Sequence, residues 1–267
     1  MRAAQAQSSV HARLLAAQLA IFLLFIAAWQ LLTQAKIISP FYFGQPSQVL
    51  AYCGKMIADG TLLRATIVTF REALAGFVIG MSTGMLLGFA LWWSRTAAAI
   101  LDPFLVALQA VPKITFAPIF ILVLGVGFVF KVAVSFAGVV IIALLSTYAG
   151  TKEADPDLID LVRSLGATKW QVFWEIVVPT ALPWIIVSME VNVGFALIGA
   201  VVAEFIASND GLGYMAVYGA GTFDMSLVLV PVLVLMLLAA CMYGIVRVIE
   251  RRLLPWKAQH HEAQWAS

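Results

Sequence analysis

The sequence predicts an all-α integral membrane protein with about six transmembrane helices, and its composition and apolar runs carry the prediction. Of the 267 residues, 63% are hydrophobic and 11% are charged, whereas soluble domains are roughly 45–50% apolar and 25% charged. The mean hydropathy is +0.98. The apolar residues fall in runs of about 20, the length of a helix that crosses roughly 30 Å of hydrocarbon. Lipid is therefore the expected solvent for most of the chain.

The apolar runs place six helical spans at roughly 14–33, 64–93, 101–124, 128–150, 183–207 and 226–250. Arg2 and Arg13 precede the first run, as they would in a secretory signal. The run is long for a signal, and no small-residue cleavage site precedes Lys36. We therefore expect an uncleaved first span. With no repeat or low-complexity linker, a single membrane domain over residues 1–267 is expected, with its core at about 60–256.

The cationic residues predict the orientation, because short loops rich in Lys and Arg stay in the cytoplasm. An even number of spans puts both termini on one side. With the N-terminus inside, ten of the 16 Lys and Arg residues are cytoplasmic: Arg2, Arg13, Arg95, Lys152, Arg163, Lys169, Arg247, Arg251, Arg252 and Lys257. Four are outside, namely Lys36, Lys55, Arg64 and Lys131, and the remaining two, Arg71 and Lys113, lie within spans. The sequence therefore predicts an inner-membrane protein with both termini cytoplasmic.

Several classes of function find no support in the residues. The cations are scattered rather than gathered into one patch, which argues against nucleic acid as a partner. Cys53 and Cys241 stand far apart without metal-ligand spacing, so neither a disulfide framework nor a metal site is expected. The three histidines, His11, His260 and His261, are all terminal. No catalytic residues are therefore predicted.

Two of the spans carry special residues. The second has glycine at every fourth position, at Gly76, Gly80, Gly84 and Gly88. Such a stripe lets another helix backbone approach closely. The third contains Pro112 and Pro118 around Lys113, and each proline removes a backbone hydrogen bond, so this span should bend or break there. Broken helices at membrane depth are tolerated where they line protein or a watery cavity.

Placing a charged side chain inside a span costs several kcal/mol of free energy unless the side chain is paired with an opposite charge or in contact with water. Charged residues within the spans are therefore candidates for function. For Arg71 and Glu72 we expect a structural role, through snorkelling or pairing with neighbouring helices. The expected lining of a passage is Pro112, Lys113, Glu190 and Asn192. Glu204 is expected to stabilise an outer loop or gate with Gly211, Leu212 and Gly213.

The segment between spans four and five, residues 151–180, is longer than a simple connection needs. Asp155 can cap a helix whose first residue is Pro156. An apolar stripe follows at helical spacing, at Leu158, Leu161, Val162 and Leu165. Gly166 is expected to end this helix.

A second short helix should start at once, since Thr168 and Gln171 have the spacing of a reciprocal capping box. It is expected to run to about Val178. Pro179 and Pro183 should then force the chain to turn before the fifth span. Residues 155–178 are therefore predicted to form a compact pair of helices on the cytoplasmic side, which we call the knob. On residues alone, such a segment could equally lie on the membrane surface.

The knob resembles a known signature. The permeases of binding-protein-dependent ABC importers carry Glu-Ala-Ala, three residues, Gly, nine residues, Ile-x-Leu-Pro. This chain has Asp160-Leu161-Val162, three residues, Gly166, nine residues and Ile176-Val177-Val178-Pro179. The Gly, Ile and Pro spacings match in full. The departures are Asp for Glu, Leu and Val for the two Ala, and Val for Leu.

The resemblance extends over about residues 39–256. It covers Phe70-Arg71, Gly76-Phe77, Gly80, Val111-Pro112, Pro118, Gly125-Val126-Gly127, Lys131, Glu204 and Gly211-Leu212-Gly213-Tyr214. These details are most similar to the nitrate, taurine and alkanesulfonate branch, which also serves thiamine and flavin precursors. The resemblance implies a type I ABC importer (MetI-like) permease fold and a passage for a small solute of that kind.

The resemblance also implies partners. A cytoplasmic ABC ATPase dimer should dock on Asp160, Leu161, Val162, Arg163, Leu165, Gly166, Ala167, Ile176 and Pro179. A second copy of this chain should complete the passage, and a periplasmic binding protein should deliver the solute. ATP and Mg²⁺ are expected on the partner, because the chain has no GxxxxGK[ST] loop and Gly54-Lys55 is followed by Met56.

Two rivals stay open on the residues alone. An ion-coupled secondary transporter would use Glu190 or Lys113 as its coupling site. An intramembrane protease or lipid transferase would need a Ser/His, paired Asp or His/Glu constellation, which the spans lack.

Overall fold

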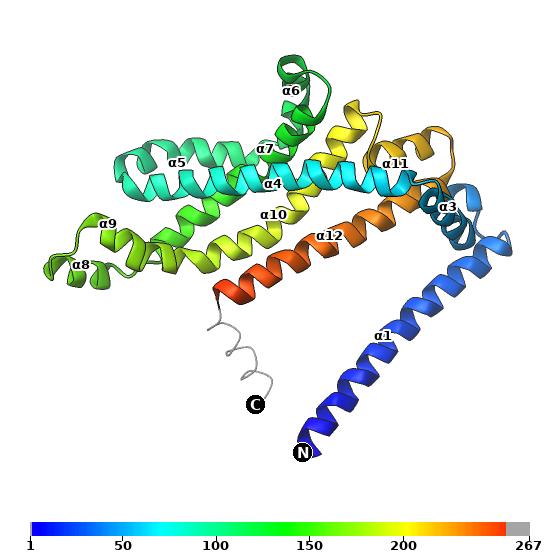
Figure 1. Cartoon of the computed structure of the whole chain (residues 1–267), viewed down its shortest axis with the longest axis horizontal. Helices are drawn as coiled ribbons and strands as arrows, with labels where there is room; N and C mark the ends of the chain where they lie inside the picture. Colours follow the sequence, from blue (N-terminus) through cyan, green and yellow to red (C-terminus); the bar gives the residue numbers. More distant parts are fainter. Residues whose placement is uncertain (1, 255–267) are drawn as a thin grey trace. The chain divides into compact units, whose positions relative to one another are not determined.

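The computed structural model describes residues 2–254, with side chains described for residue 14 and for residues 16–254. Within that range the chain is helical, with no strand (Figure 1). The elements are α1 (Arg2–Gln34), α2 (Pro40–Phe43), α3 (Pro46–Ala58), α4 (Thr61–Trp93), α5 (Arg95–Ala110), η1 (Lys113–Phe116), α6 (Ala117–Leu124), α7 (Phe128–Lys152), α8 (Pro156–Ser164), α9 (Lys169–Val172), η2 (Phe173–Val177), α10 (Val178–Ala207), α11 (Leu212–Gly221) and α12 (Met225–Leu253).

The number of spans agrees with the prediction of about six. Within residues 2–254, five helices are long and apolar enough to cross a membrane: Ala16–Gln34, Thr61–Trp93, Phe128–Lys152, Lys169–Ala207 and Met225–Leu253. A sixth arises if α5 and the η1–α6 segment count as one span. These two parts are bent by 91° at their junction. The all-α membrane fold is confirmed within the described residues.

The bend in the third span lies where the prolines predict it. Val111 is extended, with φ −74° and ψ 127°, and Pro112 is extended after it. A residue before proline is sterically disfavoured in the helical region, and proline has no amide to continue the helix. The predicted break at this site is confirmed.

The fifth span corrects one prediction. Pro179 and Pro183 do not turn the chain, because α9, η2 and α10 form one helix of 39 residues, Lys169–Ala207. η2 is a π-helical turn in which the amide of Val178 bonds to the carbonyl of Phe173. The wider turn makes room where the Pro179 ring would meet the preceding turn, and Pro183 is tolerated inside α10.

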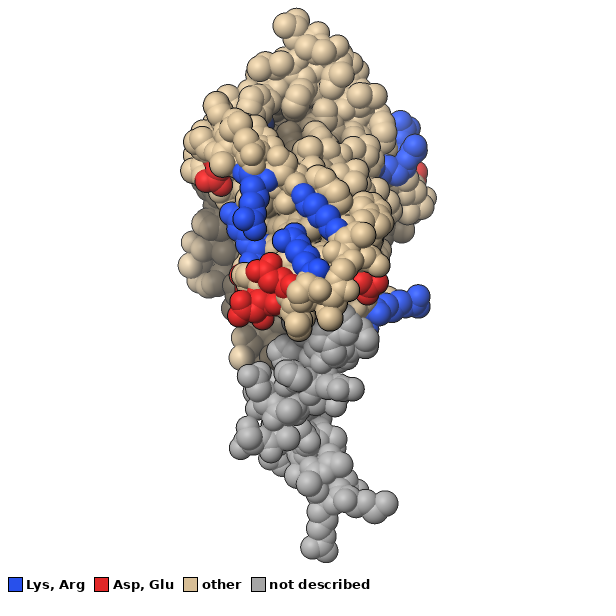
Figure 2. Space-filling model, turned by 90° about the vertical axis from the view of Figure 1, so that its left-hand side faces the viewer, with Lys and Arg blue, Asp and Glu red and all other residues tan. Residues whose placement is uncertain are grey.

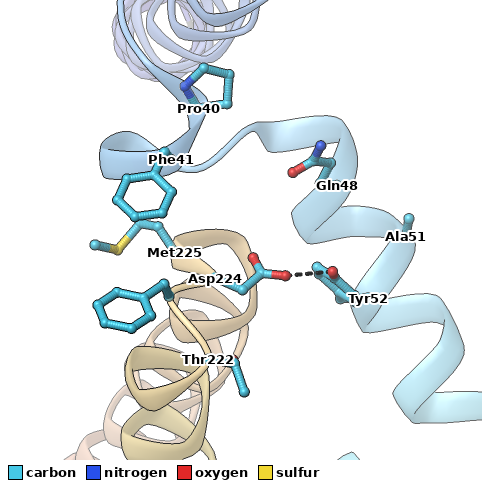
Figure 3. A pocket seen from close by; sticks show the side chains of 9 residues that line it. Pro40, Phe41, Gln48, Ala51, Tyr52, Thr222, Asp224 and Met225 are labelled. Atoms are coloured by element: carbon cyan, nitrogen blue, oxygen red, sulfur yellow. Dashed lines mark hydrogen bonds between the residues drawn. The ribbon is translucent and has the colours of Figure 1, made fainter.

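The described chain consists of two compact units, residues 2–63 with 215–233, and residues 64–214 with 234–254. The first unit contains α1 to α3 and the start of α12. Its clearest polar contact joins Tyr52 of α3 to Asp224, whose carboxylate accepts the tyrosine hydroxyl at 2.5 Å (Figure 3). Asp224 also accepts the amide of Leu227 in the first turn of α12. One carboxylate therefore links α3 to the start of α12.

The second unit is built on α4, α7 and α10. The four glycines predicted as a stripe on α4 face small or branched residues of α7 at the same four-residue spacing: Ser135, Val139, Ala143 and Thr147. A Cβ at Gly80 would lie 2.8 Å from Val139 Cβ, and one at Gly88 would lie 2.7 Å from Thr147 Cβ. The predicted close helix approach is confirmed. On its other side α7 packs along α10, with Ser135 Oγ donating to the carbonyl of Ala196.

Candidate functional site

In the knob, α8 begins and ends, and α9 begins, where the capping residues predict, whereas the expected end near Val178 is absent because the helix continues into α10. The Asp155 side chain accepts the amide of Asp157 at 2.9 Å, and Pro156 is the first residue of α8. α8 ends at Ser164, and Gly166 has φ +93°, a left-handed conformation that glycine adopts without strain. At the start of α9, Thr168 and Gln171 form the reciprocal capping box. These local predictions are confirmed.

The apolar stripe of α8 differs in burial across its width. Val162 turns inward and packs, with Ile159, on a buried cluster that includes Phe173 and Val177. The outward side chains are Leu158, Leu161 and Leu165, exposed by 44%, 57% and 80%. One turn of α8 holds about 3.6 residues, so a helix only nine residues long can present both an anchored face and a free apolar face.

Aromatic residues fix the knob to the end of α4. Trp92 and Trp93 pack with Phe173 at ring-centroid distances of 5.5 Å and 6.0 Å. The Lys169 ammonium lies 4.6 Å from the centre of the Trp93 ring and donates to the Trp93 carbonyl at 2.6 Å. Sequence reasoning missed this anchor. The pairing of Trp92-Trp93 with the aromatic run Trp170 to Trp174 was the available signal.

The predicted docking residues separate by exposure. Asp160, Leu161, Arg163, Leu165 and Gly166 are all exposed, with Asp160 and Arg163 on the side of α8 away from the leucines. Val162 and Ala167 are half-buried, and Ile176 is buried in the cluster under α8. Pro179 is exposed in the first turn of α10. The exposed members are therefore the ones that a partner could touch.

The predicted passage residues do not converge within one chain. Lys113 donates to the Gln109 carbonyl at 2.7 Å beside the break after α5, next to the exposed Pro112. Glu190 is half-buried on α10. Asn192 is fully buried and its amide lies 3.3 Å from the sulfur of Met81. Side chains two positions apart on a helix point to different faces, so Glu190 and Asn192 have different surroundings.

At the other end of α7 and α10, a polar cluster holds the segment between α10 and α11. Glu72 of α4 and Lys131 of α7 form a buried ion pair. Lys131 also donates to Ser208 Oγ at 3.2 Å. Lys131 had been counted among the cations outside the spans. The structure instead places it inside α7, buried, so the expected distribution of ten to four becomes ten to three.

Glu204 has the contacts expected of a loop-stabilising residue. It accepts the Thr69 hydroxyl at 2.7 Å and the Gly213 amide at 2.6 Å. The Leu212 amide donates in turn to the Thr69 hydroxyl oxygen at 2.8 Å. A Cβ at Gly213 would lie 2.8 Å from Glu204 Oε2, and Gly211 has φ +109°. Both glycines are therefore required by this backbone. Thr69 carried no signal in the sequence.

Comparison with known proteins bears on what these two sites serve. A family model described as "Binding-protein-dependent transport system inner membrane component" matches residues 76–255. The chain belongs to this family. It is the translocation subunit of an ABC importer, and the ion-coupled alternative is set aside.

Relatives of this permease have named functions. It is 29% identical to the taurine transport system permease protein TauC of Escherichia coli (strain K12), over 90% of this chain and 88% of TauC. It is 30% identical to the formylaminopyrimidine transport permease protein ThiX of Halalkalibacterium halodurans, over 88% of this chain and 94% of ThiX. The resemblance to the nitrate, taurine and sulfonate branch is therefore confirmed.

The fold of the permease is that of type I importers. A solved structure of the inward-facing MetNI methionine ABC transporter matches with a TM-score of 0.52 and 19% identity. The match covers 71% of this chain and 94% of the other. At this identity the likeness shows the fold alone. The predicted MetI-like permease fold is confirmed.

Proposed function

We propose that the knob is the docking point for a cytoplasmic ABC ATPase, and that it transmits the motion of that ATPase to the membrane helices. The exposed row of Leu158, Leu161 and Leu165 carries the proposal, because the adjacent face of the same helix, with Ile159 and Val162, is packed on the buried cluster and holds the row in place. Contiguous exposed apolar side chains are typical of an interaction site. Asp160 and Arg163 are exposed on the other side of α8.

The anchoring of the knob explains how motion would pass into the membrane. α8 packs on Val177 and Phe173 of η2, and η2 continues without a break into α10. Lys169 and the tryptophans add a second attachment, to α4. A docked partner that displaces the knob must therefore displace α4 and α10 together. A flexible loop would absorb the same displacement.

The proposed setting is a bacterial inner membrane with both termini and the knob in the cytoplasm. The excess of Lys and Arg on that side supports it. Of these cations, Arg95, Lys152, Arg163 and Lys169 lie at the knob end of the second unit. Lys257 lies outside the described residues.

We further propose that two copies of this chain form the passage and that a periplasmic binding protein delivers the solute. Two ATPase subunits would dock below and carry ATP and Mg²⁺, leaving this chain without catalysis of its own. The names of relatives support a small solute of the sulfonate or vitamin-precursor kind, since TauC is a taurine permease and ThiX a formylaminopyrimidine permease.

The docking proposal is tested by Leu161→Asp and by Asp160→Lys in the full transporter. Each variant should reduce co-purification with the ATPase and lower ATP-dependent uptake in proteoliposomes. Glu153→Lys, an exposed change of the same charge just before α8, is the matched control and should leave both readouts unchanged. Undiminished association and uptake in both test variants would refute the docking role.

The passage is tested separately. Lys113→Ala and Glu190→Ala should alter uptake of the transported solute while the ATPase stays bound. If uptake is unchanged in both, neither residue lines the route of the solute.

A further inference from the structure

A hollow lies beneath the knob, between α8–α9 and the ends of the membrane helices. Its volume is about 700 Å³, and its walls come from the ends of α4 and α7, the start of α5, and α8 with α9. The charged residues in the walls are Arg95, Lys152, Arg163, Lys169 and Asp160. Four cations and one carboxylate give the hollow a charge of +3. Figure 2 looks at this face and shows several Lys and Arg side chains with Asp and Glu side chains close to them.

The contacts of these cations within the chain leave their charge largely uncompensated. Arg163 and Asp160 approach only to 3.9 Å, with both side chains exposed. Such a pair is worth little. The Lys152 ammonium lies 4.1 Å from the centre of the Tyr148 ring. The ring carries no net charge, so this contact does not neutralise the positive charge of Lys152. Arg95 is exposed. The hollow is therefore built to receive an anion.

Aromatic residues indicate the depth at which the hollow lies. Trp92, Trp93 and Tyr148 are among its lining residues. Tryptophan and tyrosine concentrate at the level of the lipid headgroups, where one part of the ring system is in contact with hydrocarbon and another with water. The hollow also opens at the ends of two long apolar helices, α4 and α7. An anion at this level is most readily supplied by the membrane itself.

We propose that the hollow binds the phosphate group of an anionic phospholipid. Basic pockets between membrane helices on the cytoplasmic side suit such headgroups, and the guanidinium groups of Arg95 and Arg163 can each donate two hydrogen bonds to one phosphate. The bound lipid joins the cations of α5 and α7 to Arg163 of α8. It therefore holds the knob in place from the membrane side, and it leaves the outward leucines free. The proposal requires the hollow to face the membrane surface, and it does not require ATPase docking.

The test uses the full-length permease alone, in nanodiscs of phosphatidylcholine with increasing phosphatidylglycerol. Retained lipid is counted by native mass spectrometry, and knob protection is followed by hydrogen exchange at residues 156–172. The double variant Arg95→Gln with Lys152→Gln removes two cations that docking does not use. A cation near an anionic bilayer contributes about 1 kcal/mol, about fivefold in affinity. The double variant should therefore bind phosphatidylglycerol about 30-fold more weakly and lose protection over α8.

Two controls separate charge from folding. Arg251→Gln removes an exposed cation of α12 outside the hollow, and it should bind phosphatidylglycerol like the parent. The charge-keeping variant Arg95→Lys with Lys152→Arg should also bind it, which shows that the positions tolerate substitution.

Three results would overturn the proposal. One is equal phosphatidylglycerol binding by the parent and the Arg95→Gln, Lys152→Gln variant. Another is equal retention of phosphatidylcholine, whose headgroup carries no net charge. The third is protection of the knob by inorganic phosphate at millimolar concentration without any effect of phosphatidylglycerol, since the ligand would then be a soluble anion. Because no ATPase is present, these results stand apart from the docking test.

Discussion

The buried ion pair between Glu72 of α4 and Lys131 of α7 gives a quantitative test of how charge is held inside this permease. The side chains are only 2% and 8% exposed, so water screens the pair little. Lys131→Met keeps most of the length of the side chain and removes its charge. It leaves Glu72 buried without a counter-charge.

Removing one member of a buried pair costs about 3–5 kcal/mol, whereas replacing both members by apolar residues is often nearly neutral. For a chain of this size, about 4 kcal/mol corresponds to a fall of about 10 °C in Tm. We expect that fall for Lys131→Met, followed by tryptophan fluorescence during thermal unfolding in detergent. The double variant Glu72→Met with Lys131→Met should recover most of the lost Tm.

The permease contains a matched exposed pair as a control. Arg64 and Asp210 approach to 2.7 Å, but the Arg64 side chain is 77% exposed. Exposed pairs contribute about 0–1 kcal/mol, so Arg64→Met should lower Tm by no more than about 3 °C. A Lys131→Met variant as stable as Arg64→Met would contradict the reasoning. So would a double variant as unstable as Lys131→Met.

Three further outcomes are expected in thermal unfolding and hydrogen exchange. A Cβ at Gly84 would lie 2.5 Å from a side-chain carbon of α7, so Gly84→Ala should destabilise the protein by about 1–3 kcal/mol. Gly54 has open space around it, so Gly54→Ala should not destabilise the protein. Equal Tm values for the two variants would exclude tight packing of α4 on α7. The hydrogen bond to Asp224 raises the pKa of Tyr52 above its ordinary value of 10.0. The extra stability of the parent over Tyr52→Phe should therefore be fully present below about pH 10 and should be lost as the pH rises through the raised pKa. A Tm difference between the two proteins that stays constant to higher pH would contradict this. Thr168→Ala removes the capping box and should cost about 1 kcal/mol, seen as faster amide exchange over residues 169–172, and unchanged exchange would show that the cap contributes nothing.

Local signals in the sequence were sufficient for much of the fold. The spans follow from apolar runs, because the length of hydrocarbon to be crossed is fixed. The break at Pro112 follows from the missing proline amide and the restriction on Val111. The ends of α8 and the start of α9 follow from the capping roles of Asp155, Gly166 and Thr168. In each case the cause lies within a few residues of the effect.

Features that depend on distant partners were not predictable in the same way. Pro179 normally marks a turn, but the π-helical turn before it lets the helix continue. Val162 has the spacing of an outward stripe and is nevertheless drawn inward, because α8 packs on Phe173 and Val177. Lys131 sits three residues into an apolar helix, and only the buried Glu72 of another helix explains it. No single-sequence pattern encodes which helix will be the neighbour.

The unbroken helix from Lys169 to Ala207 has a geometric consequence. At about 1.5 Å per residue, its 39 residues measure roughly 58 Å, so a tilt of about 5° at one end moves the other by about 5 Å. The capped start of this rod lies in the knob, and Glu204 lies near its far end. Because the helix is continuous through the π-helical turn and Pro183, a small angular movement of its knob end shifts the glycine-rich segment beyond Ala207 sideways by more than the width of an atom.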